Sequence, residues 1–159
     1  MIVPVVMILS FRHRFVFIRP RKVAGTSVEM ALSTLCGDDD IVPAMIAVDE
    51  RQRQSIGGFS GNYSANRDFE RLYAQAVTTA TPEQLGSLRA PPSRYAPHMA
   101  IEDIRAACGR PLDGFRITGI ARNPYARVIS FLHMLDHFDG YLQGEAMASV
   151  TGDLRTAFD

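Results

Sequence analysis

The segment from Phe15 to Ser27 constrains the fold of this chain most. It begins as an apolar run, passes through a basic turn and ends at a helix start. Its first four residues, Phe-Val-Phe-Ile, are aromatic or β-branched, which predicts a strand buried on both faces. After the turn, apolar residues recur at the three-and-four spacing of a helix with one buried face: Val28, Ala31, Leu32 and Leu35. This order predicts a strand–loop–helix unit.

The loop of that unit has the composition of an anion site. Gly25 lets the backbone approach a ligand closely, and Thr26 and Ser27 place hydroxyl groups beside free N–H groups at the positive end of the helix dipole. Full positive charge comes from the basic residues of the turn: Arg19, Arg21 and Lys22. A phosphate or sulfate fits such a loop. An ordinary strand-to-helix connection with a capped helix has the same features, so both interpretations stay open from this stretch alone.

The residue order separates this loop from the common nucleotide-triphosphate loop, Gly-x-x-x-x-Gly-Lys-Ser/Thr, because Lys22 here precedes Gly25. The run from Lys22 through Ala24 to Ser27, Lys-Val-Ala-Gly-Thr-Ser, instead resembles the 5′-phosphosulfate loop of the sulfotransferases, particularly the Golgi carbohydrate sulfotransferases and their bacterial relatives. The resemblance implies an α/β, P-loop-like three-layer fold with a central, mostly parallel sheet flanked by helices. It also implies the donor 3′-phosphoadenosine 5′-phosphosulfate, the product 3′-phosphoadenosine 5′-phosphate, and a second motif for the 3′-phosphate.

A second strand-to-helix junction follows later in the chain. The stretch from Phe115 to Ala121 alternates in part and predicts a strand. Asn123 and Pro124 then supply an N-cap and a first-turn proline for a helix to about His137. Its predicted buried stripe consists of Tyr125, Val128, Ile129, Leu132 and Leu135.

This junction carries the second motif. Arg122, with Pro124, Arg127 and Ser130 after it, resembles the 3′-phosphate motif of sulfotransferases, Arg-x-Pro-x-x-Arg with a serine eight positions after the first arginine. Arg127 and Ser130 are three apart on the predicted helix and point in a similar direction, while the forked guanidinium of Arg122 suits phosphate oxygens. An Arg-Asn-Pro turn alone is a weak signal. Two motifs in family order, about a hundred residues apart, are much harder to obtain by chance.

His98 stands immediately before a further helical pattern. A lone histidine at a helix start is by default a cap or a surface residue. The family resemblance implies another role, because the carbohydrate sulfotransferases carry a histidine base at a helix start between the two donor motifs. The stretch from Tyr95 to Arg105 resembles that segment. The resemblance therefore implies that Lys22 and His98 are catalytic, and that no metal is needed.

Length and charge bound the remaining possibilities. With 159 residues we expect a single domain over residues 1–159, and 17 basic against 17 acidic residues indicate neither nucleic acid nor an acidic membrane surface as a partner. Cys36 and Cys108 lack the spacing of a disulfide scaffold or a metal cluster, and we interpret them as reduced core residues. The apolar start, Met1 to Leu9, is too short for a membrane span and predicts a strand or a packed tail; a cytoplasmic location is the default.

The middle of the chain is less regular. Asp38 to Asp40 predict a solvated turn, Pro43 predicts an irregular segment over residues 41–48, and residues 49–66 predict a long surface loop or a substrate-facing lid. Helices are predicted over residues 67–77, from Thr81 with Pro82 in the first turn, and over 101–108 with a stop at Gly109.

The expected function is transfer of a sulfuryl group to a hydroxyl acceptor, a carbohydrate or another small alcohol that the sequence does not specify. The resemblance ends near Leu135, and we expect a domain without the family's C-terminal helices. Two alternatives stay open. A non-catalytic nucleotide-binding module would keep both motifs without the chemistry. A small-molecule or nucleotide kinase would share a phosphate loop, but its usual Mg²⁺-binding carboxylate at a strand end is not evident.

Overall fold

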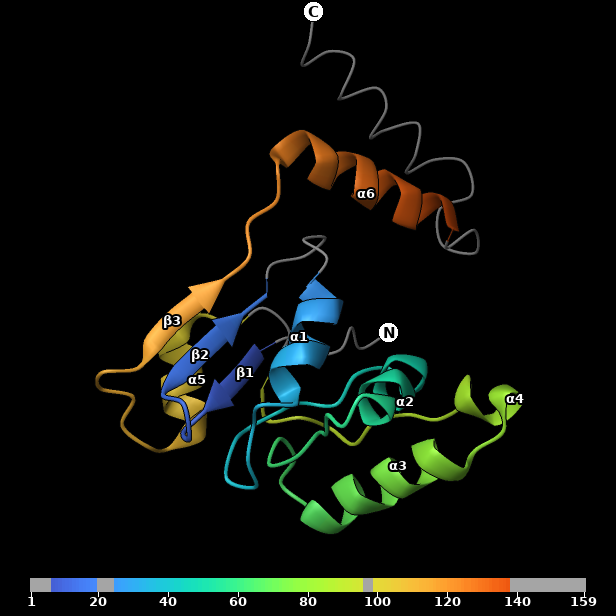
Figure 1. Cartoon of the computed structure of the whole chain (residues 1–159), viewed down its shortest axis with the longest axis horizontal. Helices are drawn as coiled ribbons and strands as arrows, with labels where there is room; N and C mark the ends of the chain where they lie inside the picture. Colours follow the sequence, from blue (N-terminus) through green and yellow to red (C-terminus); the bar gives the residue numbers. More distant parts are fainter. Residues whose placement is uncertain (1–6, 20–24, 96–98, 138–159) are drawn as a thin grey trace, which may run out of the picture. The chain divides into compact units, whose positions relative to one another are not determined.

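The computed structural model describes residues 7–19, 25–95 and 99–137, with side chains as far as residue 132 (Figure 1). Its elements are, in chain order, β1 (Met7–Ser10), β2 (Phe15–Ile18), α1 (Gly25–Ser33), α2 (Ala47–Ser55), α3 (Arg67–Thr79), α4 (Pro82–Leu85), α5 (Ile101–Cys108), β3 (Arg116–Gly119) and α6 (Pro124–His137). The chain divides into two compact units, one ending at Ala121 and one starting at Arg122, and each is described by itself. The α/β class is confirmed.

The described strands form one sheet in the order β1-β2-β3. β1 and β2 pair antiparallel across the turn at residues 11–14, and β2 and β3 pair parallel, with Ile18 opposite Gly119. The sheet is therefore mixed, whereas a mostly parallel sheet was expected. The cause is the short connection between β1 and β2, because a tight turn can join antiparallel strands only.

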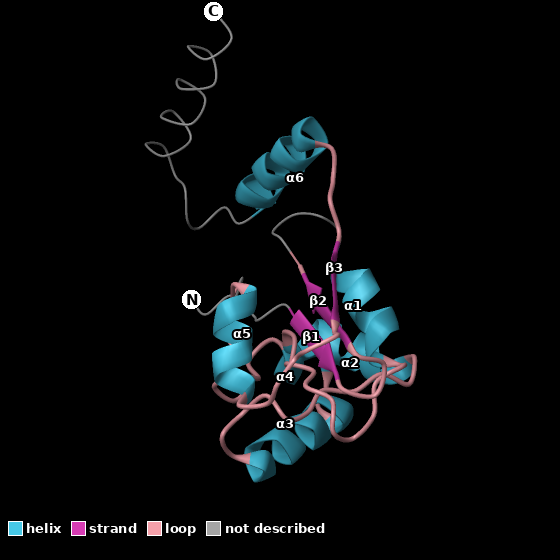
Figure 2. Ribbon diagram, turned by 90° about the vertical axis from the view of Figure 1, so that its left-hand side faces the viewer, coloured by secondary structure: helices cyan, strands magenta, loops and turns pink. Residues whose placement is uncertain are grey.

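The two faces of the sheet pack against different helices of the first unit. Leu9 and Val16 lie in one hydrophobic cluster with residues that include Ile104 of α5, while Ile8 and Phe17 lie in another, against which Leu32 of α1 packs. Figure 2 shows α5 and α1 on opposite sides of the strands. The sheet side chains alternate between the two faces, as the two-residue period of a strand requires.

Side-chain caps hold the starts of α3 and α4. The Asn66 side chain accepts hydrogen bonds from two backbone N–H groups at the start of α3, and Thr81 and Gln84 form a reciprocal capping box at α4. α5 ends at Gly109, which has a left-handed φ of 62° that favours glycine. These predicted helices are confirmed.

Two predictions for the polar middle of the chain are wrong. Residues 49–66 were expected to form a loop or lid, but α2 occupies the first part of this segment and turns Glu50 and Arg53 into the core. Asp40 was expected in a solvated turn, but it is buried and its carboxylate accepts hydrogen bonds from Ser10 and from the backbone N–H groups of Phe11 and Gly37. Hydropathy does not reveal these positions because the buried residues are charged.

The inward face of α1 also differs from the prediction. Val28 and Leu35, expected in the core, are 38% and 53% exposed. The helix instead buries Gly25, Glu29, Met30 and Ser33. Both cysteines are free. Cys36 is buried as expected, and burial raises the pKa of its thiol to about 12, whereas Cys108 is only partly buried against the core.

The second unit is described through α6. The Asn123 side chain accepts hydrogen bonds from the backbone N–H groups of Tyr125 and Ala126, which confirms the predicted N-cap. The predicted buried stripe is not observed, since Tyr125 is 71% and Ile129 57% exposed. No helix within the described ranges has the length and apolar character needed to cross a membrane.

Candidate functional site

The first candidate site lies where β2 leads into α1. Arg21, Lys22 and Ala24 fall outside the described residues, and so does His98. α1 begins at Gly25, which is buried; Thr26 is half-buried and Ser27 is exposed. Of the predicted anion ligands, the structure thus places the two hydroxyl residues in the first turn of α1, where backbone N–H groups lack helical partners.

Gly25 has a structural role that the sequence did not indicate. A Cβ atom built at this position would overlap Cδ of Arg19, the residue that follows β2. The group that approaches the Gly25 backbone closely is therefore the Arg19 side chain. Any larger residue at position 25 would displace it.

Arg19 connects the start of α1 to its interior. Its Nη1 atom donates a hydrogen bond of 2.6 Å to Oγ1 of Thr26 and lies 3.5 Å from Oε2 of Glu29, in the middle of the same helix. The Arg19 side chain is 18% exposed, and the Glu29 side chain is fully buried. One guanidinium thus contacts both a predicted anion ligand and a buried carboxylate.

Glu29 belongs to a buried ion cluster, which we define as Arg19, Glu29, Glu50 and Arg53. Nη2 of Arg53 lies 3.2 Å from Oε1 of Glu29, and its Nη1 lies 3.1 Å from Oε2 of Glu50. The same Nη1 donates to the carbonyl oxygen of Pro43 at 3.0 Å. The side chains of Glu29, Glu50 and Arg53 have no exposed surface.

Burial dominates the electrostatics of this cluster. It raises the pKa of Glu29 to about 7, against the opposing effects of Arg53 and Arg19. It also lowers the pKa of Arg19, while Glu29 acts to raise it. Sequence reasoning missed the cluster. The available signal was the Glu50 and Arg53 pair at three-residue spacing, but nothing local indicated that Glu29 would meet it.

The second candidate site belongs to the second unit. Arg127 and Ser130 lie on α6, three residues apart as predicted, and Arg122 precedes the helix. Arg122 and Arg127 are exposed, and Ser130 is half-buried. The structure places these residues on one junction. It does not place them relative to Gly25, Thr26 and Ser27, which belong to the first unit.

Within the first unit, the sheet places β2 beside β3. β2 and β3 are parallel and in register from Phe15 opposite Arg116 to Ile18 opposite Gly119. Their carboxyl ends therefore lie side by side, and the chain leaves both strands at the same end of the sheet (Figure 1). In open α/β sheets, ligands bind outside the carboxyl ends of the strands.

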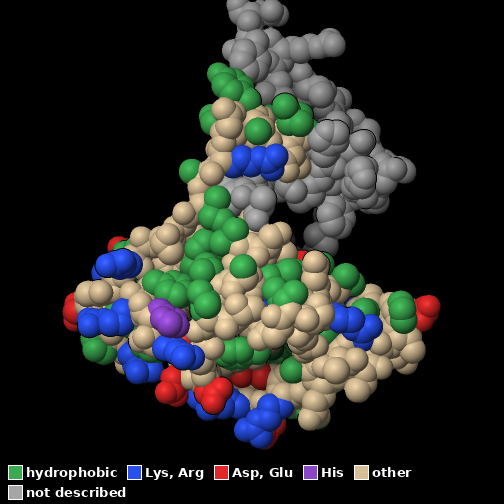
Figure 3. All heavy atoms as spheres, in the orientation of Figure 1, with side chains coloured by type: hydrophobic (Ala, Val, Ile, Leu, Met, Phe, Trp, Pro, Cys, Tyr) green, Lys and Arg blue, Asp and Glu red, His purple; other side chains and the backbone are tan. Residues whose placement is uncertain are grey.

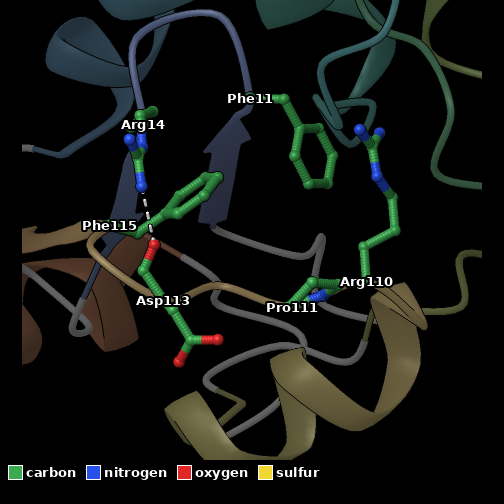
Figure 4. A pocket seen from close by; sticks show the side chains of 6 residues that line it. All are labelled: Phe11, Arg14, Arg110, Pro111, Asp113 and Phe115. Atoms are coloured by element: carbon green, nitrogen blue, oxygen red, sulfur yellow. Dashed lines mark hydrogen bonds between the residues drawn. The ribbon is translucent and has the colours of Figure 1, made fainter.

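A cavity of about 500 Å³ lies at the opposite end of the strands, beside the turn between β1 and β2 (Figure 4). Its lining consists of Phe11, Arg14, Arg110, Pro111, Asp113 and Phe115. The Arg110 guanidinium stacks 3.6 Å from the Phe11 ring centroid, and Arg14 donates to the backbone oxygen of Asp113. Basic and acidic side chains intermingle over this end of the first unit (Figure 3). The residues that line this cavity are not those predicted to bind an anion, so we treat it separately from both candidate anion sites.

Comparison of the chain with protein-family models, with curated proteins and with solved structures gave no match. Within the part of the chain that the structure describes, no three His, Cys, Asp or Glu side chains are grouped to hold a metal ion.

Proposed function

We propose that the chain is a sulfotransferase that uses 3′-phosphoadenosine 5′-phosphosulfate and has the P-loop-like three-layer organisation of that family. The observation that carries the proposal is the parallel pairing of β2 with β3. β2 precedes the first motif and β3 precedes the second, and the pairing brings the carboxyl ends of these strands to one end of the sheet. A nucleotide with phosphate groups at its 5′ and 3′ positions requires two anion sites on the same side.

Each end of the nucleotide has its own residues in this proposal. The loop with Arg21, Lys22 and Ala24 and the first turn of α1, with Gly25, Thr26 and Ser27, hold the 5′-phosphosulfate. At the other junction, Arg122, Arg127 and Ser130 hold the 3′-phosphate. Backbone N–H groups, hydroxyl groups and guanidinium groups are all donors, as an oxyanion ligand demands.

The chemistry is an in-line displacement at sulfur. The acceptor hydroxyl oxygen forms a new S–O bond while the bond from sulfur to the bridging oxygen of the donor breaks, which releases 3′-phosphoadenosine 5′-phosphate. His98 takes the acceptor proton, and Lys22 neutralises the charge that develops on the bridging oxygen. As in phosphoryl transfer, positioning and charge stabilisation supply most of the catalysis. The acceptor class is a carbohydrate or another small alcohol.

Replacement of His98 tests the catalytic part of the proposal. His98→Ala should keep the nucleotide affinity and the thermal stability of the wild type, but sulfuryl transfer to a hydroxyl acceptor should fall at least about a hundredfold, the usual contribution of a general base. Transfer from ³⁵S-labelled donor to a panel of sugars and alcohols measures this. His13→Ala is the matched control, because His13 is exposed in the turn between β1 and β2.

The pH profile supplies an independent check. The wild-type rate should fall below about pH 6.5, where a histidine of ordinary pKa becomes protonated and can no longer accept a proton. If an acceptor is found and His98→Ala transfers sulfuryl groups at the wild-type rate, His98 is not the base. Tight nucleotide binding without transfer to any acceptor would support the non-catalytic module instead.

A further inference from the structure

The hydrogen bond between Arg19 and Thr26 fixes the direction in which the Thr26 hydroxyl can act. A guanidinium has five N–H donors and no acceptor, so Thr26 Oγ1 must accept the 2.6 Å hydrogen bond from Arg19 Nη1. The hydroxyl proton therefore points to a different partner. A hydroxyl in this state is a donor, which suits an oxyanion beside the first turn of α1.

The ion cluster holds Arg19 in the position from which it makes this contact. Glu29 lies 3.5 Å from Arg19 Nη1 and is itself held at 3.2 Å by Arg53, which Glu50 and the Pro43 carbonyl fix in turn. The Arg19 stem also passes over Gly25, where the missing Cβ leaves room for it. Thr26 is thus connected through one guanidinium to side chains of α1 and α2 in the core.

This arrangement calls for an explanation beyond fold stability. A buried ion pair is often no more stabilising than apolar residues of the same volume, because both charges lose their hydration. Glu29 cannot contact a substrate, since it has no exposed surface. Glu29 lies beside Arg19, whose side chain is partly exposed, and Arg19 contacts Thr26.

We propose that Arg19, anchored by the buried Glu29, is a positioning residue that holds the Thr26 hydroxyl as a hydrogen-bond donor to the bound oxyanion. The inference rests on the proposed function of the loop and adds a selectivity to it. The loop favours a fully ionised oxyanion, which offers only acceptors, over a ligand group that must itself donate. Arg19 acts through Thr26 and not through contact with the ligand.

A double-mutant cycle on binding tests this statement. Arg19→Met keeps an unbranched stem over Gly25 but has no N–H groups, and Thr26→Val keeps the shape of Thr26 but has no hydroxyl. With Thr26 present, Arg19→Met should weaken ligand binding about three- to tenfold, the range for one neutral hydrogen bond. In the Thr26→Val background, the same change should weaken binding less than about twofold.

Calorimetry with two probes, 3′-phosphoadenosine 5′-phosphate and inorganic pyrophosphate, provides the readout. Thr26→Ser retains a hydroxyl and should retain the effect of Arg19→Met, whereas Thr26→Val should remove it; a purely structural role of Arg19 would give the same effect in both backgrounds. Arg12→Met, at an exposed arginine in the turn between β1 and β2, is the control and should change neither affinity. Should Arg19→Met fail to fold, Arg19→Leu, which also has no N–H groups, enters the same cycle.

The possible results separate this inference from the proposed function. Equal effects of Arg19→Met with and without the Thr26 hydroxyl would overturn the positioning role while leaving nucleotide binding intact. Coupling measured with pyrophosphate, together with no preference for 3′-phosphoadenosine 5′-phosphate over pyrophosphate, would support the positioning role and contradict the sulfotransferase donor. Failure of the wild type to bind either probe would overturn both.

Discussion

Glu29 shows how a single carboxylate connects the core of the first unit to its candidate site. Its side chain is fully buried between Arg19 and Arg53, and burial raises its pKa to about 7 from an ordinary value of 4.5. Glu50 and Asp49 raise the pKa further by like-charge repulsion, while the two arginines lower it. The charge state of Glu29 therefore changes near neutral pH.

The raised pKa predicts a pH-dependent stability. The folded state binds the Glu29 proton more tightly than the unfolded state does, so its contribution is fully present below pH 4.5 and is lost as the pH rises through about 7. A shift of this size corresponds to about 3 kcal/mol. The free energy of unfolding of the wild type, measured with denaturant relative to Glu29→Gln, should decrease by up to that amount over this pH window. A difference that stays constant with pH would contradict the assignment.

At the scale of elements, the pairing of β2 with β3 depends on a close backbone approach. A Cβ atom built at Gly119 would lie 2.9 Å from the carbonyl oxygen of Ile18, nearer than real Cβ contacts. Backbone cannot yield as a flexible side chain can. Gly119 therefore lets the two strands, each of which leads to a candidate anion site, lie side by side.

Gly119→Ala should consequently lower the free energy of unfolding by about 1–3 kcal/mol, the usual effect of overpacking. Denaturant unfolding measures it, with Gly86→Ala as the matched control, because a Cβ at Gly86 would lie 3.9 Å from its nearest neighbour, the Glu83 carbonyl oxygen. The control should change stability by less than about 1 kcal/mol. If the two variants are equally stable, the close approach at Gly119 is not what holds the strands together.

The elements that the sequence predicted are those whose signals are local. The cap at Thr81, the left-handed stop at Gly109 and the N-cap at Asn123 each act within three residues of their own position, and the structure shows them there. For the same reason, the α3, α4, α5 and α6 helices could be predicted from their capping and apolar patterns.

The elements that the sequence missed depend on contacts between distant segments. α2 is polar throughout, and its buried Glu50 and Arg53 become intelligible only when Glu29 of α1 lies against them. The same contact explains why α1 turns Glu29 inward and leaves Val28 exposed. Of the candidate site, the sequence predicted the anion loop and the α6 motif. The contacts of Arg19 with Thr26 and with the ion cluster required three-dimensional information.

At the scale of the whole molecule, the central claim is that one chain holds both ends of a single nucleotide. In the proposed function, the first unit supplies the loop that binds the 5′-phosphosulfate, and the second unit supplies the residues that bind the 3′-phosphate. The two motifs should therefore act on the same ligand, although they are about a hundred residues apart in the chain. Loss of one site should weaken the binding of only those nucleotides that carry the matching phosphate.

Calorimetry on the wild type and on Arg122→Ala tests that claim most directly. The wild type should prefer 3′-phosphoadenosine 5′-phosphate to ADP with Mg²⁺. Arg122→Ala should weaken the binding of 3′-phosphoadenosine 5′-phosphate by about 1.5–3 kcal/mol, the range for a hydrogen bond to a charged group. The affinity for adenosine 5′-phosphosulfate, which lacks the 3′-phosphate, should not change. Arg105→Ala, at an exposed position of α5, is the control. Equal losses for both ligands, or a wild-type preference for ADP with Mg²⁺, would contradict the account.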